Sequence, residues 1–446
     1  GDGALTLTDV GDGLEALDAS TAEGDITATI AGADAASVAL GSGNDTLTAS
    51  AADLTTNAVI DGGEGQNRLV LDSNSTTQYQ MSNIQTLLLN GEGGHAATFS
   101  ARDVQGLETI ALANGYNVDT AVVHLGAQDI SLNVLGVAGG AITLDHSGVS
   151  VVDVTPEADA ENTQTATTVL TLTNAAALDL NVAEGSDYHG NITANKAQSL
   201  EAAVAGQVNN QITATAATSA VFNLQNADDV SAVDLQANKL VNLEVTAAGD
   251  ANFNGSALNG LEALVVNTAG HFQTDAVLGA INQIELSGSG QATINGALGA
   301  ADQDEYGITV NATGLNDGLT LGTITTNGTN ITVNAAAVLG RVTLDDIDAG
   351  SGDVNIDLSS VGGDISLGNI SGQNVTLDAS DALGEFLVPM IRAVAPTGEI
   401  TAADSVSFSG TELATNRMTV NATGDRFAGN LNGGLKADVY SVKLES

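Results

Sequence analysis

The sequence contains no cysteine and no tryptophan, and only three of its 446 residues are proline. Without cysteine, the chain has neither a disulfide framework nor thiolate ligands for a metal ion. Aromatic residues make up only 3% of the chain, so Ala, Val, Leu and Ile are expected to form its core, which suits a narrow, regular interior. The scarcity of proline leaves backbone N–H groups free for long ladders of hydrogen bonds between strands.

Basic residues are scarce as well. Ten Lys and Arg residues stand against 54 Asp and Glu residues, which gives a formal net charge of −44. Such a chain is not expected to bind nucleic acid through its phosphates, and an anionic lipid surface would repel it. Carboxylates on a regular stack lie within the ~8 Å over which physiological salt screens them poorly. Ca²⁺, which takes oxygen ligands, is therefore the expected counterion.

Long apolar runs are also missing. No stretch approaches the ~20 apolar residues that a membrane helix needs, so no membrane span is predicted. The chain opens Gly1-Asp2-Gly3, without Met, a basic start or a signal peptide. Because it opens in mid-pattern, we expect a processed or partial chain. High charge can indicate disorder, but 43% of the residues are hydrophobic and alternate with polar ones, so a folded chain is expected.

A short phrase recurs along the sequence: an apolar residue, two spacers, Leu or Ile, and then Glu or Gln. Copies end at Ile84-Gln85, Leu107-Glu108, Leu243-Glu244, Leu261-Glu262 and Ile284-Glu285. The steps from 84 to 107 and from 261 to 284 are both 23 residues. A fixed period of this size is typical of a solenoid, in which one supersecondary unit stacks on copies of itself.

Short runs in which apolar and polar residues alternate predict β-strands. Ile331-Thr-Val333, Val342-Thr-Leu344, Val354-Asn-Ile356 and Val375-Thr-Leu377 are examples. Their starts lie about 11 residues or a multiple of that apart, so two strands fit one turn of about 22 residues. Gly, Asn and Asp in the gaps suit tight corners. The sequence predicts an all-β fold, a parallel β-helix or β-solenoid with coils of about 22 residues, for which a right-handed winding is the common form.

The pattern predicts a domain organisation in three parts. Residues 1–380 are expected to form the β-solenoid, and residues 400–446 its continuation and C-terminal end. Between them, residues 381–399 include Pro389 and Pro396 and differ in composition. We interpret this segment as an insertion or clasp: a loop packed on the stack, a short helix or a contact with a neighbouring molecule.

Asparagine recurs just after predicted strands, as at Asn311, Asn334 and Asn421. Two interpretations are open. These side chains could form ladders between successive coils, or asparagine could simply serve here as a good turn residue.

A pair of glycine-rich turns predicts a calcium site. Residues 40–47 (LGSGNDTL) follow most of the nonapeptide repeat G-G-x-G-x-D-x-U-x, and residues 62–69 follow it one coil later with Asn in the Asp position. In that repeat the glycines let carbonyls and a carboxylate face one Ca²⁺ ion. The candidate metal-site residues are Gly41, Gly43, Asp45, Asp61, Gly63, Gly65 and Asn67. Because the repeats are not in tandem, a turn that needs no metal is the alternative.

Other acidic groups are candidate calcium ligands. The first comprises Asp302, Asp304 and Glu305, and the second Asp345, Asp346, Asp348 and Asp353. A third group comprises Asp9, Asp12 and Glu15. Carboxylates held close together on a rigid stack favour a bound cation. The alternative is that each run of charge is a solvated face.

Features of a catalytic site are scarce. The five His residues are scattered, without a pair at metal-ligand spacing, and no nucleophile elbow occurs. Two carboxylates suffice for a glycosidase, but with 54 acidic residues the presence of two is uninformative. The chain is therefore not expected to be an enzyme.

The Gly43-Asn-Asp-Thr-Leu47 turn, the phrases Ile84-Gln-Thr-Leu87 and Leu107-Glu-Thr-Ile110, and the run VTLDAS at 375–380 together carry a family likeness. Over most of residues 1–446 the chain resembles bacterial surface-layer (S-layer) proteins of the acidic, Cys-free, type I-secreted kind, and RTX-like calcium-repeat surface proteins. The resemblance implies a calcium-dependent β-solenoid that self-assembles on the cell exterior, often anchored to lipopolysaccharide or another surface glycan. The chain departs from that family in lacking tandem nonapeptides and evident anchoring or C-terminal secretion domains.

These features lead to one functional expectation and two alternatives. We expect an extracellular structural protein of a bacterial cell surface that self-assembles, with Ca²⁺, into a surface layer or filament and is thus a homo-oligomer. The first alternative is an adhesin or stalk module of a calcium-dependent surface protein. The second is a β-helix enzyme that degrades polysaccharide.

Overall fold

The structure is a computed structural model that describes residues 3–445 with gaps. The residues outside the description are 1–2, 12, 33, 51–52, 73–77, 91–95, 98–99, 118, 123–127, 159–160, 300–305, 374, 380–381, 384–385, 388–390, 394–397, 403–404, 409–411, 414–416, 424–425, 430–431, 434–438 and 446. The chain forms two compact units, Gly1–Ala217 (unit 1) and Thr218–Ser446 (unit 2).

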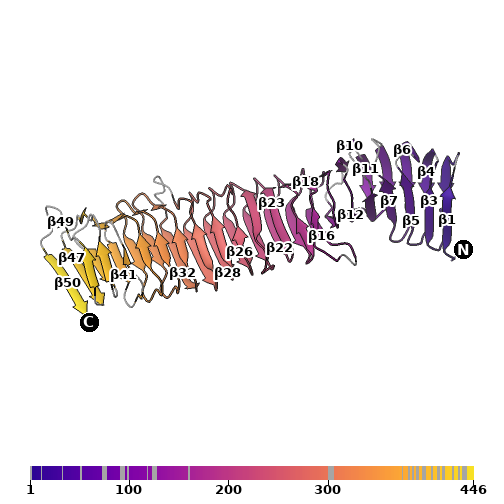
Figure 1. Ribbon diagram of the computed structural model, residues 1–446. Coiled ribbons are helices and arrows are strands. Elements are labelled where there is room, and N and C mark those ends of the chain that lie inside the picture. Colours follow the sequence, from indigo (N-terminus) through magenta and orange to yellow (C-terminus); the bar gives the residue numbers. More distant parts are fainter. Residues whose placement is uncertain are drawn as a thin grey trace. The chain divides into compact units, whose positions relative to one another are not determined.

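The described residues form strands and no helix, and the strand pairings are parallel. Each strand pairs with its counterpart about one coil later, as when Thr46 pairs with Arg68 in unit 1 and Ile308 with Ile331 in unit 2. Figure 1 shows the strands of each unit side by side as a stack. The prediction of an all-β, parallel β-solenoid with coils of about 22 residues is confirmed, and its handedness stays a prediction.

Unit 1 contains three sets of strands. Sheet A is formed by β1 (Leu5–Val10), β3 (Ile26–Ile30), β5 (Thr46–Ser50), β7 (Arg68–Asp72), β9 (Thr86–Asn90), β12 (Thr109–Leu112), β14 (Ile130–Leu135), β16 (Val149–Thr155), β19 (Ala177–Val182) and β22 (Ser199–Val204). Sheet B is formed by β2 (Ala16–Asp18), β4 (Ala35–Ala39), β6 (Leu54–Asp61), β8 (Gln78–Ser82) and β11 (Ser100–Gln105). The remaining strands, grouped as sheet C, are β10 (Ala96–Ala97), β13 (Asp119–Val122), β15 (Ala141–Leu144), β17 (Gln164–Ala166), β18 (Val169–Leu172), β20 (Ser186–Tyr188), β21 (Ile192–Thr193) and β23 (Gln207–Thr213).

Unit 2 also contains strands of sheets A and C. Its sheet A is formed by β24 (Ser219–Leu224), β26 (Asn242–Ala247), β28 (Ala263–Thr268), β30 (Gln283–Gly288), β32 (Ile308–Leu315), β35 (Ile331–Asn334), β38 (Val354–Asp357), β41 (Val375–Ala379), β44 (Gly398–Ala402), β47 (Arg417–Thr423) and β50 (Val439–Glu445). Its sheet C is formed by β25 (Ser231–Gln236), β27 (Ala251–Asn252), β29 (His271–Thr274), β31 (Gln291–Ile294), β33 (Leu319–Leu321), β36 (Val342–Leu344), β39 (Ile365–Leu367), β42 (Phe386–Leu387), β45 (Ser405–Phe408) and β48 (Arg426–Gly429).

Many later coils of unit 2 carry a third, short strand, which differs from the expectation of two strands a coil. These strands are β34 (Ile324–Thr325), β37 (Ile347–Asp348), β40 (Ile370–Gly372) and β43 (Ile391–Ala393), followed by the pair β46 (Glu412–Leu413) and β49 (Asn432–Gly433). Strands of two or three residues are too short to show the alternation from which a strand is recognised in a sequence.

The predicted insertion or clasp at 381–399 contains β42, β43 and the start of β44. They pair in parallel with β39, β40 and β41 of the preceding coil. The described residues of this segment therefore take part in the stack.

Alternation along each strand sends one set of side chains into the coil. In sheet A of unit 1, Leu47, Leu69 and Leu87 lie in register and are fully buried. Burial of each such side chain stabilises the fold by about 1.5–3 kcal/mol. The core of unit 2 adds aromatic residues: Phe253 lies with its ring centroid 5.1 Å from that of Phe222 and 5.8 Å from that of Phe272. The narrow aliphatic core matches the expectation from composition.

Candidate functional site

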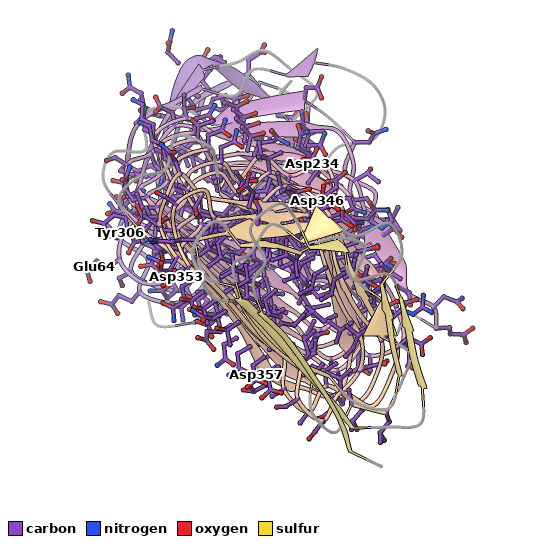
Figure 2. The ribbon with its side chains drawn as sticks, turned by 90° about the vertical axis from the view of Figure 1, so that its left-hand side faces the viewer. Glu64, Asp234, Tyr306, Asp346, Asp353 and Asp357 are labelled. Carbon is purple, nitrogen blue, oxygen red and sulfur yellow. The ribbon has the colours of Figure 1, made fainter. Side chains whose placement is uncertain are left out.

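The two glycine-rich turns of unit 1 stack directly on each other. The N–H of Glu64 donates to the carbonyl oxygen of Gly41 at 2.9 Å. Gly63 and Gly65 have φ angles of +74° and +94°, and a Cβ on either would overlap the backbone carbonyl of Gly41 or Gly43 below it. The Gly-x-Gly spacing thus follows from close stacking of two corners, while the intervening Glu64 projects outward (Figure 2).

A column of side chains joins these corners. Asp45 is 1% exposed, and its carboxylate accepts the N–H of Ile26 at 2.7 Å and that of Gly41 at 3.1 Å. In the next coil the side-chain oxygen of Asn67 accepts the N–H of Asp45 at 3.0 Å. In the coil after that, the side-chain oxygen of Gln85 accepts the N–H of Asn67 at 2.7 Å. Each side chain caps a backbone N–H of the preceding coil.

A second column beside it runs the opposite way. The Oδ1 atom of Asp25 accepts the N–H of Asn44 at 2.8 Å, and the Oδ1 atom of Asn44 accepts the N–H of Gln66 at 2.9 Å. Here each side chain caps a backbone N–H of the following coil. Together the two columns hold each corner to the coil before it and the coil after it.

These hydrogen bonds bear on the predicted calcium site. Ca²⁺ takes six to eight oxygen ligands, whereas both carboxylate oxygens of Asp45 and the side-chain oxygen of Asn67 accept backbone N–H groups. Across the described residues no group of three or more His, Asp and Glu side chains is placed to hold a metal ion. The geometry favours the alternative of a turn satisfied without metal, and Ca²⁺ binding at this corner stays a prediction.

The candidate group at 345–353 is spread around the coil. Asp345 and Asp346 lie between β36 and β37, Asp348 lies in β37, and Asp353 precedes β38. The carboxylate of Asp346 accepts the N–H of Asn369 at 2.7 Å, and that of Asp348 accepts the hydroxyl of Ser371 at 2.6 Å. Figure 2 shows Asp346 and Asp353 well apart. These four carboxylates are close together in the sequence, but the fold places them at different positions around the coil.

The other two candidate groups fall partly or wholly outside the described residues. Asp302, Asp304 and Glu305 lie in the gap at 300–305, and Asp12 of the third group is also outside the description.

Capping from coil to coil recurs in both units. In unit 1, Asp129 accepts the N–H of Val149 at 2.7 Å, and Asn191 accepts that of Gln211 at 3.0 Å. In unit 2, Asp250 accepts the N–H of His271 at 2.8 Å, and Asn330 accepts that of Asp353 at 2.9 Å. Sequence reasoning missed this role. The signal for it is an Asp or Asn at a corner, recurring about one coil later.

The described asparagines of sheet A serve as turn residues, and the interpretation as a ladder of asparagines between coils stays a prediction. Asn311 and Asn334 lie in register, and each accepts the N–H two residues further on at 3.3 Å, as a turn residue does. Asn311 also donates to the carboxylate of Glu285 in the preceding coil at 2.8 Å. The side chain of Asn421 lies outside the description.

The outer face of sheet A in unit 1 brings like charges together. Asp179 on β19 lies in register with Glu201 on β22. Partial burial raises the pKa of Asp179, and the charges of Glu201 and Asp129 raise it further. One strand earlier, Asp153 accepts a hydrogen bond from the amide of Asn181 at 2.9 Å. This face combines carboxylates held by amides with carboxylates that repel one another.

A few polar groups lie inside unit 1. His146 is 1% exposed, its Nε2 atom lies 2.6 Å from the hydroxyl of Ser150, and burial lowers its pKa. The hydroxyl of Tyr188 donates to the carbonyl of Thr168 at 2.7 Å, and complete burial raises its pKa. These partners are hydroxyl and backbone groups, an arrangement that fixes the side chains in the core.

In comparisons with known proteins, the chain matches no family model, no curated protein and no solved structure. Within the described part of the chain, no helix has the length and apolar character that a membrane-spanning helix needs.

Proposed function

We propose that this chain is a structural protein, in which copies associate outside the cell into a layer or filament and Ca²⁺ offsets their carboxylates. The proposal rests chiefly on one observation. The polar residues that a sequence search selects as a site, Asp45 and Asn67 above all, cap the backbone of neighbouring coils. Polar chemistry of this kind stabilises a scaffold.

The charge of the chain supports the role of a divalent cation. Residues 1–391 contain five basic residues against 48 acidic ones, so most of these carboxylates have no basic partner within that stretch. Successive strands are ~4.8 Å apart, which is shorter than the ~8 Å screening length at physiological ionic strength. Two copies with such surfaces repel each other unless a strongly bound cation lies between them. Ca²⁺ suits an all-oxygen surface.

Electron microscopy of the purified chain tests this function. With Ca²⁺ we expect ordered sheets or filaments, and with a chelator we expect them to disperse. Mg²⁺ is the matched control, because it retains its waters and bridges carboxylates less readily than Ca²⁺. If the particles stay monomeric at high concentration in every condition, the result would contradict the proposal and favour the alternative of an adhesin or stalk module. The bacterial cell surface and attachment to lipopolysaccharide or another glycan stay predictions that rest on the resemblance.

A further inference from the structure

The two most exposed large apolar side chains of the described residues lie at one corner of unit 2. Leu339 is 65% exposed and Leu383 is 72% exposed. Leu339 lies between β35 and β36, and Leu383 lies between β41 and β42, two coils later. Apolar side chains that gather at one place on a surface mark a contact with a partner, whereas scattered ones do not.

Gly362 leaves a gap between these leucines. Its N–H donates to the carbonyl of Val338 at 2.8 Å, and the N–H of Leu383 donates to the carbonyl of Val361 at 2.9 Å. Leu339, Gly362 and Leu383 therefore occupy the same position in three successive coils, roughly 4.8 Å apart. A Cβ on Gly362 would overlap the backbone of Leu339. The corner thus presents two leucines with one position between them that has no side chain.

The same corner carries a pair of opposite charges. Arg341 forms an ion pair with Asp364 of the next coil at 3.1 Å, and their side chains are 68% and 51% exposed. Arg341 is the only Lys or Arg between positions 240 and 391 of the sequence. The carboxylate of Asp317 in the preceding coil lies beside Gly340. The corner therefore presents charges of both signs on a chain that is otherwise strongly acidic.

This arrangement is complementary to itself. Leu339 and Arg341 lie on one coil, and Gly362 and Asp364 occupy the corresponding positions on the next. A two-fold axis that runs along the chain direction, midway between these coils, turns the stack of a second copy antiparallel. It places Leu339 of each copy over Gly362 of the other, and Arg341 of each copy over Asp364 of the other. An isologous contact needs a surface that matches itself in this way.

We propose that the corner formed by Leu339, Gly362 and Leu383 is an isologous contact between two antiparallel copies of this chain. In this contact the leucines of the two copies alternate: Leu339 of the second copy lies between Leu339 and Leu383 of the first, at a spacing of about 4.8 Å. Arg341 and Asp364 of the two copies form a cluster of alternating charge beside them. This inference rests on the proposed self-assembly and adds an apolar contact to those that Ca²⁺ bridges.

The first test removes the apolar part of the contact. Leu339→Ser/Leu383→Ser is compared with Val230→Ser/Val277→Ser, which removes two other exposed apolar side chains of unit 2. Sedimentation velocity of the full chain, with Ca²⁺ and with a chelator, measures association, and circular dichroism checks that each variant is folded. We expect the leucine variant to associate at least about tenfold more weakly than the control, because burial of one leucine side chain corresponds to at least that factor.

The second test uses the charges of two different copies. Arg341→Asp leaves two acidic residues at the pair, and Asp364→Arg leaves two basic ones, so each variant alone should associate more weakly than the wild type. An equimolar mixture of the two variants should associate more strongly than either alone, because each copy then faces the opposite charge across the contact. Raising the NaCl concentration should weaken association of the mixture.

The inference and the proposed function fail in distinguishable ways. If the wild type assembles and the leucine variant associates as well as its control, the corner is not a contact, while the proposed function stands. If the mixture of charge variants associates no more strongly than its components, the antiparallel pairing is wrong. If the wild type associates in no condition, both proposals fail.

Discussion

Asp179 and Glu201 lie opposite each other on adjacent parallel strands, and the residue in register with Asp179 on its other side is the uncharged Val151. Burial raises the pKa of Asp179, and the neighbouring charges of Glu201 and Asp129 add to the effect. The pair is a point where the folded stack carries electrostatic repulsion that the unfolded chain does not.

Removing this repulsion should stabilise the protein. A raised folded-state pKa means that the folded state binds the proton more tightly, so stability falls as the pH rises through that pKa, above the ordinary value of 3.8. At pH 7, Asp179→Asn should increase the free energy of unfolding by about 0.2–1 kcal/mol. Thermal unfolding measures it, and the gain should shrink in high salt. The exposed Glu184→Gln is the control for net charge, and an equal gain there would contradict the assignment.

The stacked glycines give a second prediction, with a matched pair of positions. Gly63 and Gly115 both have positive φ angles, +74° and +79°, but only Gly63 lies against another backbone, while a Cβ on Gly115 would meet nothing within 4 Å. Gly115→Ala should therefore cost only the backbone strain, about 1 kcal/mol. In Gly63→Ala the new Cβ would also overlap the carbonyl oxygen of Gly41, so this variant should lose about 3 kcal/mol or more of unfolding free energy. Chemical denaturation of both variants compares them, and equal losses would mean that the corners are not closely stacked.

The repeat period and most strands could be predicted from the sequence because residues that pack in the core must be apolar, which leaves a regular pattern in the sequence. Val375 and Leu377 must both point into the coil, so Thr376 between them points out, and this alternation is visible in the letters. The two-residue strand at Ile324 and Thr325 is too short to show such a pattern. Its place is decided by pairing with Ile347 in the next coil, which local sequence does not encode.

The candidate site was harder to predict for a different reason. Gly-x-Gly-x-Asp can hold an ion or cap a backbone, and the same residues serve both chemistries. The outcome depends on where the N–H groups of the adjacent coils lie. Asp45 meets the N–H of Ile26 in the preceding coil, and Asn67 meets that of Asp45. A spacing of one coil brings the turns together without specifying which atoms face one another.

Asp45 itself provides the third prediction. Asp45→Ala leaves the N–H groups of Ile26 and Gly41 without their acceptors, and a buried unsatisfied donor costs about 1–3 kcal/mol. Denaturation should show a loss of that size, and the loss should be the same with Ca²⁺ and with a chelator if the turn is held by hydrogen bonds alone. Asp228→Ala, at an exposed corner position in unit 2, should change stability by less than about 0.5 kcal/mol. A loss at Asp45 that appears only with Ca²⁺ would instead establish the predicted metal site.

His146 provides the last prediction, which concerns pH. Burial lowers its pKa below the ordinary 6.5, although the carbonyl of Gln128 and the charges of Asp129 and Asp145 oppose this. The unfolded chain therefore binds the proton more readily than the folded one, so stability is complete above pH 6.5 and is lost as the pH falls through the folded-state pKa. His146→Gln removes the titrating group, so its melting temperature should vary less than that of the wild type between about pH 5 and 7, where histidine titrates. The comparison of slopes holds even if the variant is less stable throughout, because only the change with pH is read. Identical slopes for the two proteins would mean that the buried ring does not couple protonation to unfolding.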